Sequence, residues 1–231
     1  MTSTAGVFGP SVHKTVDEKT ERSFVLCTEY ERTKAEAEKL VMDYVSKGQH
    51  IVIVNPTRIY GPGLLNESNS VTRMINLYIN GRFRVLPGDG NSIGNYVFID
   101  DIVRGHILAM EKGKSGEKYI MGGANVSYRD FFNVLSCVTG KKYFQFNLPI
   151  SFMLAISSVM LFLAKTIQIS PLIIPPWVRK YNYNWELSSQ KSINQLGYRF
   201  TSLEEGLRRT VKYLTELNLN PSWKMDQNIS L

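Results

Sequence analysis

The chain has 231 residues, a length that can bury the core of one domain with an appended lobe. Hydrophobic residues make up 43% and charged residues 20%, a mixture that excludes an intrinsically disordered chain. The formal net charge is +7, but the Lys and Arg residues are scattered in runs no longer than two, which argues against nucleic-acid binding and fits a basic surface that tolerates an anionic cofactor.

The first predicted helix spans residues 29–47, where apolar residues recur at three- and four-residue spacing and Gly48 supplies the stop: Ala37, Leu40, Val41, Tyr44 and Val45. The β-branched run at residues 51–54 follows it, and Asn55–Pro56 ends this run. A short run that is apolar on both faces and follows a helix predicts a central parallel strand.

Strand and helix signals continue to alternate. A helix is expected over residues 70–80, a buried strand over 96–99, and a helix that Asp100 or Asp101 caps and Gly113 ends. A strand over residues 119–121 precedes a helix that begins at a Ser127–Asp130 capping box and runs to Gly140. This alternation predicts an α/β class with a largely parallel sheet.

From Leu148 onward the pattern is helical, and Ser202 with Glu205 opens the last predicted helix. Residues 143–164 carry no charge and are rich in Leu, Ile, Met and Phe, but polar residues and Pro149 interrupt the run. A membrane span needs about 20 apolar residues. We therefore favour a helix buried in the protein or lining an apolar pocket, and membrane contact by residues 148–176 stays open as the second interpretation.

The two cysteines, Cys27 and Cys137, form no CxxC motif and have no His cluster beside them. Neither a disulfide framework nor a metal site is predicted, and Cys137, in an apolar stretch, is expected in the core. The first residues show no basic region followed by an apolar core, so no signal peptide is predicted. We expect a reducing, cytoplasmic compartment.

Tyr30 and Lys34 are four residues apart and therefore neighbours on one helix face. A fixed ammonium beside a phenol favours the phenolate, which lets a tyrosine give or take a proton while hydride moves at carbon. This spacing alone is common on solvated helices, so its weight depends on the motifs around it.

Several separated motifs accompany this pair in a fixed order. They are TSTAGVFG at residues 2–9, VNPTRIYGPG at 54–63, PGDG at 87–90, VFIDD at 97–101, QLGY at 195–198 and SLEEGL at 202–207. The set resembles the NAD-dependent epimerase/dehydratase family of extended short-chain dehydrogenases/reductases, from Thr2 to about Leu214. The resemblance implies a partial doubly wound, Rossmann-like parallel sheet and NAD or NADP as cofactor.

The family's roles transfer to matching positions. Tyr30 would be the acid/base, Lys34 would hold the nicotinamide ribose hydroxyls and lower the pKa of Tyr30, and Thr4, with Ser3 as the near alternative, would bind the reacting oxygen. Pro56, Thr57 and Ile59 would close over the nicotinamide, mostly through backbone groups. Ser and Thr also favour turns, and Asn55–Pro56 also ends a strand, so structural explanations stand beside these roles.

Two further groups of polar residues are weaker candidates. Asn69 and Ser70 stand at a predicted helix start, where free N–H groups suit a cofactor phosphate or a substrate, although a plain N-cap explains them equally well. The Asp100–Asp101 pair suits a metal or general-acid role, but helix capping is the better explanation.

The resemblance also implies a division of the chain. Residues 1–147 would form a truncated NAD(P)-binding domain with the catalytic motif, residues 148–217 a smaller, mainly helical substrate lobe, and residues 218–231 a mobile tail. The family opens with a strand, a GxxGxxG turn and a helix, and here the only such glycine spacing near the start is Gly6-x-x-Gly9. We therefore expect an incomplete fragment that binds NAD(P) feebly or not at all.

A second departure concerns the substrate. Nucleotide-sugar members carry an arginine that binds the substrate diphosphate, and the matching position here is Gly94. Together with the apolar lobe, this favours the dihydroflavonol-reductase-like, 3β-hydroxysteroid-dehydrogenase-like and hopanoid-associated epimerase-like branch, which the run GEKYIMGGAN at residues 116–125 also resembles.

The resulting hypothesis is an NAD(P)-dependent oxidoreductase that interconverts an alcohol and a ketone or aldehyde on a mostly apolar small molecule. A nucleotide-sugar epimerase or dehydratase is the first alternative. An inactive binding module or truncation product is the second. The resemblance also makes a homodimer through the helix carrying Tyr30 an expectation.

Overall fold

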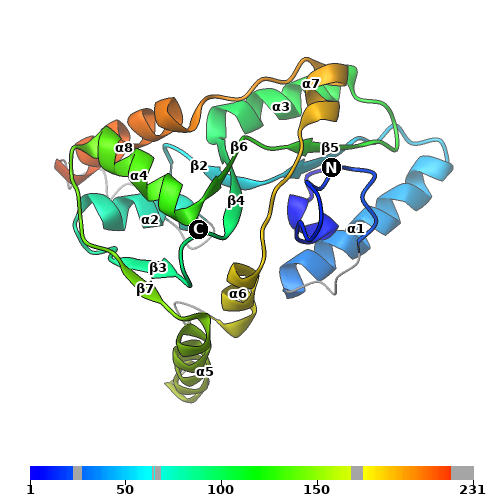
Figure 1. Cartoon of the computed structure of the whole chain (residues 1–231). Helices are drawn as coiled ribbons and strands as arrows, with labels where there is room; N and C mark the ends of the chain where they lie inside the picture. Colours follow the sequence, from blue (N-terminus) through cyan, green and yellow to red (C-terminus); the bar gives the residue numbers. More distant parts are fainter. Residues whose placement is uncertain (23–27, 64, 66–68, 168–173, 220–231) are drawn as a thin grey trace.

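The computed structural model describes the backbone of residues 1–22, 28–63, 65, 69–167 and 174–219 (Figure 1). Its helices are η1 (Ala5–Phe8), α1 (Glu29–Ser46), α2 (Ser70–Ile79), α3 (Ile99–Lys112), α4 (Tyr128–Thr139), α5 (Ile150–Ile167), α6 (Pro175–Arg179), η2 (Lys180–Asn182), α7 (Gln190–Leu196) and α8 (Leu203–Leu219). Its strands are β1 (Ile53–Pro56), β2 (Arg58–Tyr60), β3 (Val85–Pro87), β4 (Ile93–Phe98), β5 (Lys118–Met121), β6 (Ala124–Ser127) and β7 (Phe146–Leu148).

Three of the four strand pairs are parallel. β1 pairs with β5 from Ile53 opposite Lys118 to Pro56 opposite Met121, β2 pairs with β4, and β3 pairs with β7, whereas the β4–β6 pair is antiparallel. Thr2 forms a parallel bridge with Val54, so the N-terminal segment lies beside β1. The predicted α/β class with a largely parallel sheet is confirmed.

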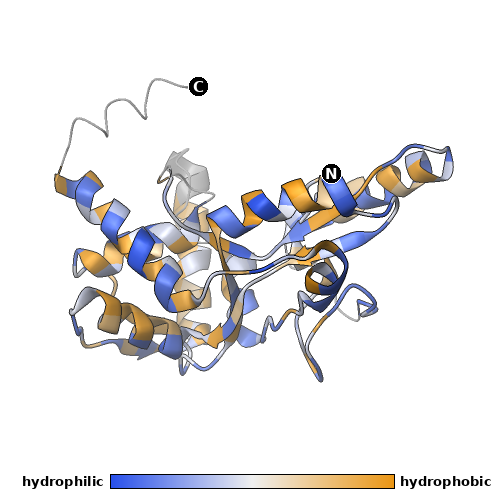
Figure 2. Ribbon diagram, turned by 90° about the horizontal axis from the view of Figure 1, so that it is seen from above, coloured by the Kyte–Doolittle hydropathy of each residue, from blue (hydrophilic) through white to orange (hydrophobic). Residues whose placement is uncertain are grey.

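The largest core cluster lies between the sheet strands and α2, α4 and α8. It contains Ile75, Phe98, Phe131 and Leu207, each fully buried. Along the surface helices, hydrophobic and hydrophilic residues alternate (Figure 2), as expected for helices with one face on a core. In this cluster, α8 packs directly on α2 and α4.

α1 buries a different face from the predicted one. Leu40 and Tyr44 are exposed, whereas Glu31 and Glu38 are buried. The buried face is polar because each of these carboxylates pairs with a lysine of another segment, Lys180 and Lys118 respectively. The apolar periodicity of this helix correctly predicted a helix but not its orientation.

The favoured interpretation of the apolar stretch was a helix buried in the protein or lining an apolar pocket, and burial in the protein is wrong for its largest exposed side chains. α5 projects from the body of the molecule (Figure 1), and Phe152, Val159 and Phe162 are exposed by 55%, 58% and 71%. Within the described residues, no helix has the length and apolar character needed to cross a membrane.

Helix ends show which caps the sequence predicts well. Ser127 Oγ accepts a hydrogen bond from Asp130 N at 3.0 Å, and Gly140 ends α4 in the left-handed conformation, as predicted. Neither Asp100 nor Asp101 caps α3, whose N-cap is Phe98 without a side-chain bond. Both aspartates lie in the first turn and bind other segments instead.

Three smaller expectations concern the cysteines and the tail. Cys137 is exposed on α4, contrary to the expected core position. Cys27 lies outside the described residues, as does the tail beyond α8.

Candidate active site

The N-terminal segment, the end of β1 and α1 meet at one place. Ser3 N donates to Val54 O at 2.8 Å, and the Asn55 side-chain amide donates to Thr4 O at 3.1 Å and to Glu38 Oε1 at 2.8 Å. Glu38 in turn pairs with Lys118 of β5 at 2.6 Å. These contacts fix residues 2–4 against the middle of the helix that carries Tyr30 and Lys34.

The first turn of α1 is held by a capping box. Glu31 N donates to Thr28 Oγ1 at 3.3 Å, and Thr28 N donates to Glu31 Oε2 at 3.2 Å. The Glu31 carboxylate is buried and also pairs with Lys180 of η2. A Cβ atom at Gly6 would collide with this carboxylate, so η1 can approach α1 only because Gly6 has no side chain.

Lys34 lies between Tyr30 and the N-terminal segment. Its ammonium is 5.8 Å from the centroid of the Tyr30 ring and donates to Thr2 O at 3.1 Å. The structure therefore brings Tyr30, Lys34 and residues 2–4 to one site. It leaves Tyr30 52% exposed.

The predicted contact between Tyr30 and a hydroxyl of the N-terminal segment is not formed. Thr4 caps η1, its Oγ1 accepting from Gly6 N at 3.3 Å, and among the described residues no hydrogen bond joins the Tyr30 hydroxyl to Thr4 or Lys34. Ser3 is buried, and its Oγ has no hydrogen-bond partner within that part of the chain.

The pKa of Tyr30 is raised above its ordinary value, first by burial and then by the neighbouring Glu31. The sequence led us to expect the opposite direction, from the Lys34 ammonium. The reason is that the buried part of the phenol loses hydration and a carboxylate is adjacent in sequence, so the neutral form of Tyr30 is favoured.

The expected cofactor residues follow the same strand end. Pro56 pairs with Met121 at the end of β1, Thr57 N donates to Met121 O at 3.2 Å, and Ile59 on β2 packs against a core cluster with Val54 and Val97.

Three side-chain oxygens in this region are buried and have no hydrogen-bond partner among the described residues: Ser3 Oγ, Asn55 Oδ1 and Thr57 Oγ1. Buried polar atoms normally find partners, so a cluster without them at the end of a parallel strand fits a site that binds a polar group. The residues present fit the nicotinamide end of a dinucleotide, because Lys34, bound to Thr2 O, adds a cationic donor at the N-terminal segment that carries Ser3.

Asn69 and Ser70 lie at the start of α2, Asn69 as its N-cap without a side-chain capping bond and Ser70 as its first residue. Within the described part of the chain, the hydrogen bonds and ring contacts of Tyr30, Lys34 and Thr4 are made with other residues than these two. The structure does not bring these two residues into direct contact with the others.

Sequence reasoning missed Arg58 on β2. Its guanidinium donates to Tyr128 Oη at 2.8 Å and to Tyr96 Oη at 3.3 Å, and lies 5.5 Å from the centroid of each ring. No carboxylate of the described residues pairs with it. Burial opposes its charge, but Tyr128, Tyr96 and Tyr181 raise the pKa of Arg58 overall. A lone cation inside an otherwise uncharged strand was the available signal.

The segment at residues 180–181 connects this arginine to α1. Lys180 pairs with Glu31, next to Tyr30, and the Tyr181 ring lies 5.4 Å from the Tyr128 ring in an edge-on arrangement. Residues 180–181 therefore contact both α1 and a tyrosine that binds Arg58.

Comparison with known proteins adds a family. Residues 1–122, more than half of the chain, match the model described as the NAD dependent epimerase/dehydratase family. The chain is similar to a protein of Synechocystis named as a putative dihydroflavonol 4-reductase, with 27% identity over 194 residues, covering 80% of this chain and 54% of that protein.

A second relative is the sterol demethylase protein B of Methylococcus capsulatus, with 36% identity over 114 residues, covering 49% of this chain and 33% of that protein. The chain thus spans about half the length, or less, of these curated relatives.

The fold is shared with a solved UDP-glucuronic acid 4-epimerase from Bacillus cereus in complex with NAD. The TM-score is 0.71 at 23% identity, covering 94% of this chain and 60% of that one. At this identity the likeness concerns the fold.

Proposed function

The chain belongs to the NAD dependent epimerase/dehydratase family, and from that premise we propose that it carries the catalytic residues of an NAD(P)-dependent oxidoreductase. The reaction would interconvert an alcohol and a ketone or aldehyde on a mostly apolar small molecule. The observation that carries the proposal is the position of Lys34, whose ammonium lies over the Tyr30 ring and binds the Thr2 carbonyl.

Tyr30 would be the acid/base. A phenol is neutral at neutral pH, and burial and Glu31 favour that neutral form of Tyr30, so its proton would go to the oxygen of a carbonyl substrate. Thr4 would bind the same oxygen by turning its hydroxyl away from Gly6 N, with Ser3 Oγ as a second donor.

Lys34 would donate to the ribose hydroxyls of the cofactor, while Pro56, Thr57 and Ile59 border the nicotinamide and the Thr57 hydroxyl gains a partner. A nicotinamide cofactor supplies the hydride donor or acceptor at the substrate carbon. Asn69 and Ser70 would bind the substrate at the end that lies away from Tyr30.

The names of the relatives support a mostly apolar substrate. One is named for a dihydroflavonol and another for a sterol, and both compounds carry an oxygen function on an apolar ring system. The chain departs from a nucleotide-sugar enzyme at Gly94, where it has no charge to bind a diphosphate.

One observation favours a second candidate, a nucleotide-sugar epimerase or dehydratase. Arg58 places a guanidinium beside Gly94, so a cation is present near that position although a different strand supplies it. The two candidates differ in stoichiometry, because an epimerase or dehydratase re-reduces its own substrate and consumes no net NAD(P)H.

The test is an assay of NAD(P)H consumption against a panel of flavonoid and steroid ketones, using the longest reading frame that contains this chain. Tyr30→Phe should lower kcat by at least about a hundredfold, the usual contribution of a general acid. Tyr44→Phe is the matched control, because Tyr44 is an exposed tyrosine on the same helix with Lys47 5.5 Å from its ring centroid.

Equal activities of the two variants would contradict the role of Tyr30. Turnover of a nucleotide sugar without net NAD(P)H consumption would instead support the second candidate.

A further inference from the structure

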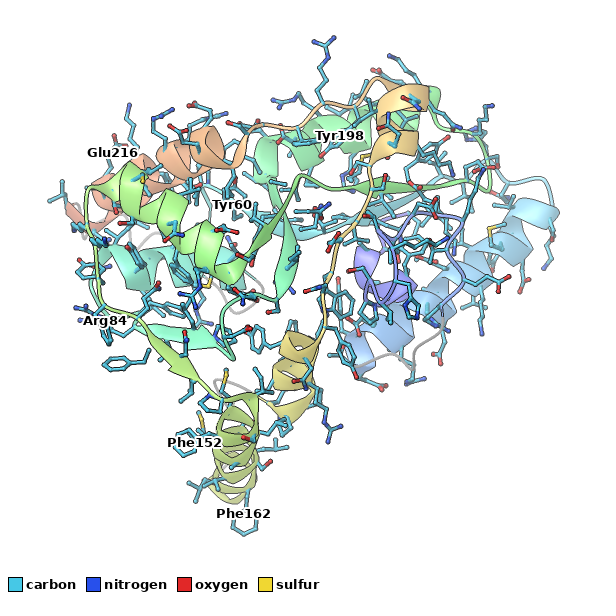
Figure 3. The ribbon with its side chains drawn as sticks, viewed as in Figure 1. Tyr60, Arg84, Phe152, Phe162, Tyr198 and Glu216 are labelled. Carbon is cyan, nitrogen blue, oxygen red and sulfur yellow. The ribbon has the colours of Figure 1, made fainter. Side chains whose placement is uncertain are left out.

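One end of the molecule exposes a concentration of large apolar side chains, which we call the apolar pole. It lies where α5 projects from the body beside α6 and β7 (Figure 1). Its members are Phe144 and Phe146 near β7, Phe152, Ile156, Val159, Phe162 and Leu163 on α5, and Trp177 on α6, all between 41% and 71% exposed. The side chains of Phe152 and Phe162 project outward from α5 (Figure 3).

The apolar pole is larger than scattered surface hydrophobics. Phe152, Ile156, Val159 and Leu163 follow one another at four-, three- and four-residue intervals and so form a stripe along α5, while Phe162 projects from another side. Phe144 and Phe146 form an edge-on ring pair, with centroids 4.8 Å apart, that extends this surface onto β7. Soluble monomers rarely expose a contiguous apolar surface of this kind, and where they do it marks an interaction site.

The chain segment that carries the apolar pole has charges of one sign, and Asp89, beside Arg129, adds a carboxylate at its edge. Residues 131–185 contain no Asp or Glu but five basic residues, Lys141, Lys142, Lys165, Arg179 and Lys180. Lys180 is engaged with Glu31, whereas Lys141, Lys142 and Arg179 are exposed, as is Arg84 next to β7's partner strand β3. A basic rim around an apolar surface is complementary to an anionic bilayer, whose headgroups attract Lys and Arg.

A hollow of about 350 Å³ joins this rim to the apolar pole. It is lined by Leu86, Arg129, Asn133, Lys142, Tyr143, Phe144 and Gln145. Gln145 Nε2 is buried there and has no hydrogen-bond partner among the described residues. Two cations and an unused amide donor beside an exposed phenylalanine suit the phosphate of a lipid headgroup whose chains lie against Phe144.

We propose that the apolar pole docks on the surface of an anionic lipid bilayer. The phenylalanines and Trp177 enter the boundary between headgroups and acyl chains, and Lys142 and its basic neighbours bind the headgroups. The inference is independent of the proposed function. A second copy of the chain fits less well, because two such poles would bring their predominantly basic rims together.

The test is flotation of the full chain with two kinds of vesicle, pure phosphatidylcholine and a mixture of phosphatidylcholine with phosphatidylserine. Binding is expected to the mixed vesicles and to fall at least about tenfold in high salt, because the headgroup contacts are screened. The double variant Phe152→Glu, Phe162→Glu should lose at least about tenfold of the binding, because two rings no longer leave water. Both positions are exposed, so the fold should tolerate the change.

Met110→Glu is the matched control, because Met110 is 75% exposed on α3, outside the apolar pole. It should bind the mixed vesicles as the unmodified chain does. Lys142→Gln should weaken that binding about fivefold, with Lys39→Gln, an exposed lysine of α1, as its control.

Two results would overturn the proposal. Absence of binding to both vesicles, with a dimer in sedimentation that Phe152→Glu, Phe162→Glu dissociates, would make the apolar pole an interface between copies. Equal binding to both vesicles, unaffected by salt and by Lys142→Gln, would remove the anionic surface as the partner.

Discussion

The guanidinium of Arg58 occupies the space above Gly94, on the neighbouring strand, where a Cβ atom would collide with its Nη1 and Cζ atoms. β2 and β4 pair in parallel with Arg58 opposite Tyr96, two residues beyond Gly94. The glycine that removes an expected arginine from β4 thus makes room for an arginine from β2. The cation is held by phenols of Tyr96 and Tyr128.

Gly94→Ala should therefore displace Arg58 and lower the free energy of unfolding by about 1–3 kcal/mol, the usual cost of overpacking. Urea denaturation of Gly94→Ala, Arg58→Ala and the double variant gives the coupling between the two positions. In a chain that already carries Arg58→Ala, the loss of unfolding free energy caused by Gly94→Ala should be smaller by at least about 1 kcal/mol. Strictly additive effects would show that Gly94 serves another purpose, such as avoiding a close contact with the Tyr96 ring.

A second prediction separates two adjacent aspartates. Asp101 is fully buried and accepts from Thr201 N at 2.7 Å and from Thr201 Oγ1 at 2.9 Å, whereas Asp100 is exposed and pairs with Arg209. Asp101→Ala should lower the free energy of unfolding by about 2–3 kcal/mol, because it removes a buried carboxylate that accepts two hydrogen bonds from the half-buried Thr201. Asp100→Ala should cost less than about 1 kcal/mol. Equal costs in urea denaturation would support helix capping by the pair instead.

The fold was predictable where one local rule decides the outcome. Short uncharged apolar runs predicted β1 and the second half of β4, and the Ser127–Asp130 and Ser202–Glu205 pairs marked the starts of α4 and α8. Orientation was not predictable in the same way. Leu40 and Tyr44 of α1 face outward, and the inner face instead carries carboxylates that pair with Lys118 and Lys180, which are distant in sequence.

The candidate site was also predictable only in part. Residue spacing placed Tyr30 beside Lys34, and the motif order placed residues 2–4 near them. The direction in which the pKa of Tyr30 shifts was not predictable, since it depends on how much of the ring is buried. Arg58 was missed because its importance lies in the neighbouring strand, where Gly94 leaves space.

A third prediction concerns the ion pair between Glu31, which follows Tyr30 in sequence, and Lys180. Glu31 is 2% exposed, and its side chain pairs with Lys180, whose side chain is 17% exposed. Lys180→Met should lower the free energy of unfolding by about 3 kcal/mol, because it leaves a buried carboxylate without its cation. The exposed Glu204–Arg208 pair supplies the control, and Arg208→Met should cost about 0.5 kcal/mol.

The effect of Lys180→Met should be relieved by a second change. Glu31→Gln in the same chain removes the buried charge, so thermal and urea denaturation should show the double variant more stable than Lys180→Met alone. A double variant less stable than the single one would mean that the capping box, and not the ion pair, dominates at Glu31.

The last prediction uses the buried tyrosines at high pH. Burial raises the pKa of Tyr60 and of Tyr198, and Tyr128 together with burial raises that of Tyr181. Unfolded, these phenols lose their protons near their ordinary pKa of about 10, whereas the folded chain retains them. The stabilising contribution is therefore complete below about pH 10 and declines as pH rises, by about 1.4 kcal/mol per pH unit for each tyrosine.

Urea denaturation between about pH 8 and about pH 11 should show this decline. Tyr198→Phe should reduce the slope by one tyrosine's share, and the exposed Tyr44→Phe should leave it unchanged. An unchanged slope in Tyr198→Phe would mean that Tyr198 ionises without unfolding.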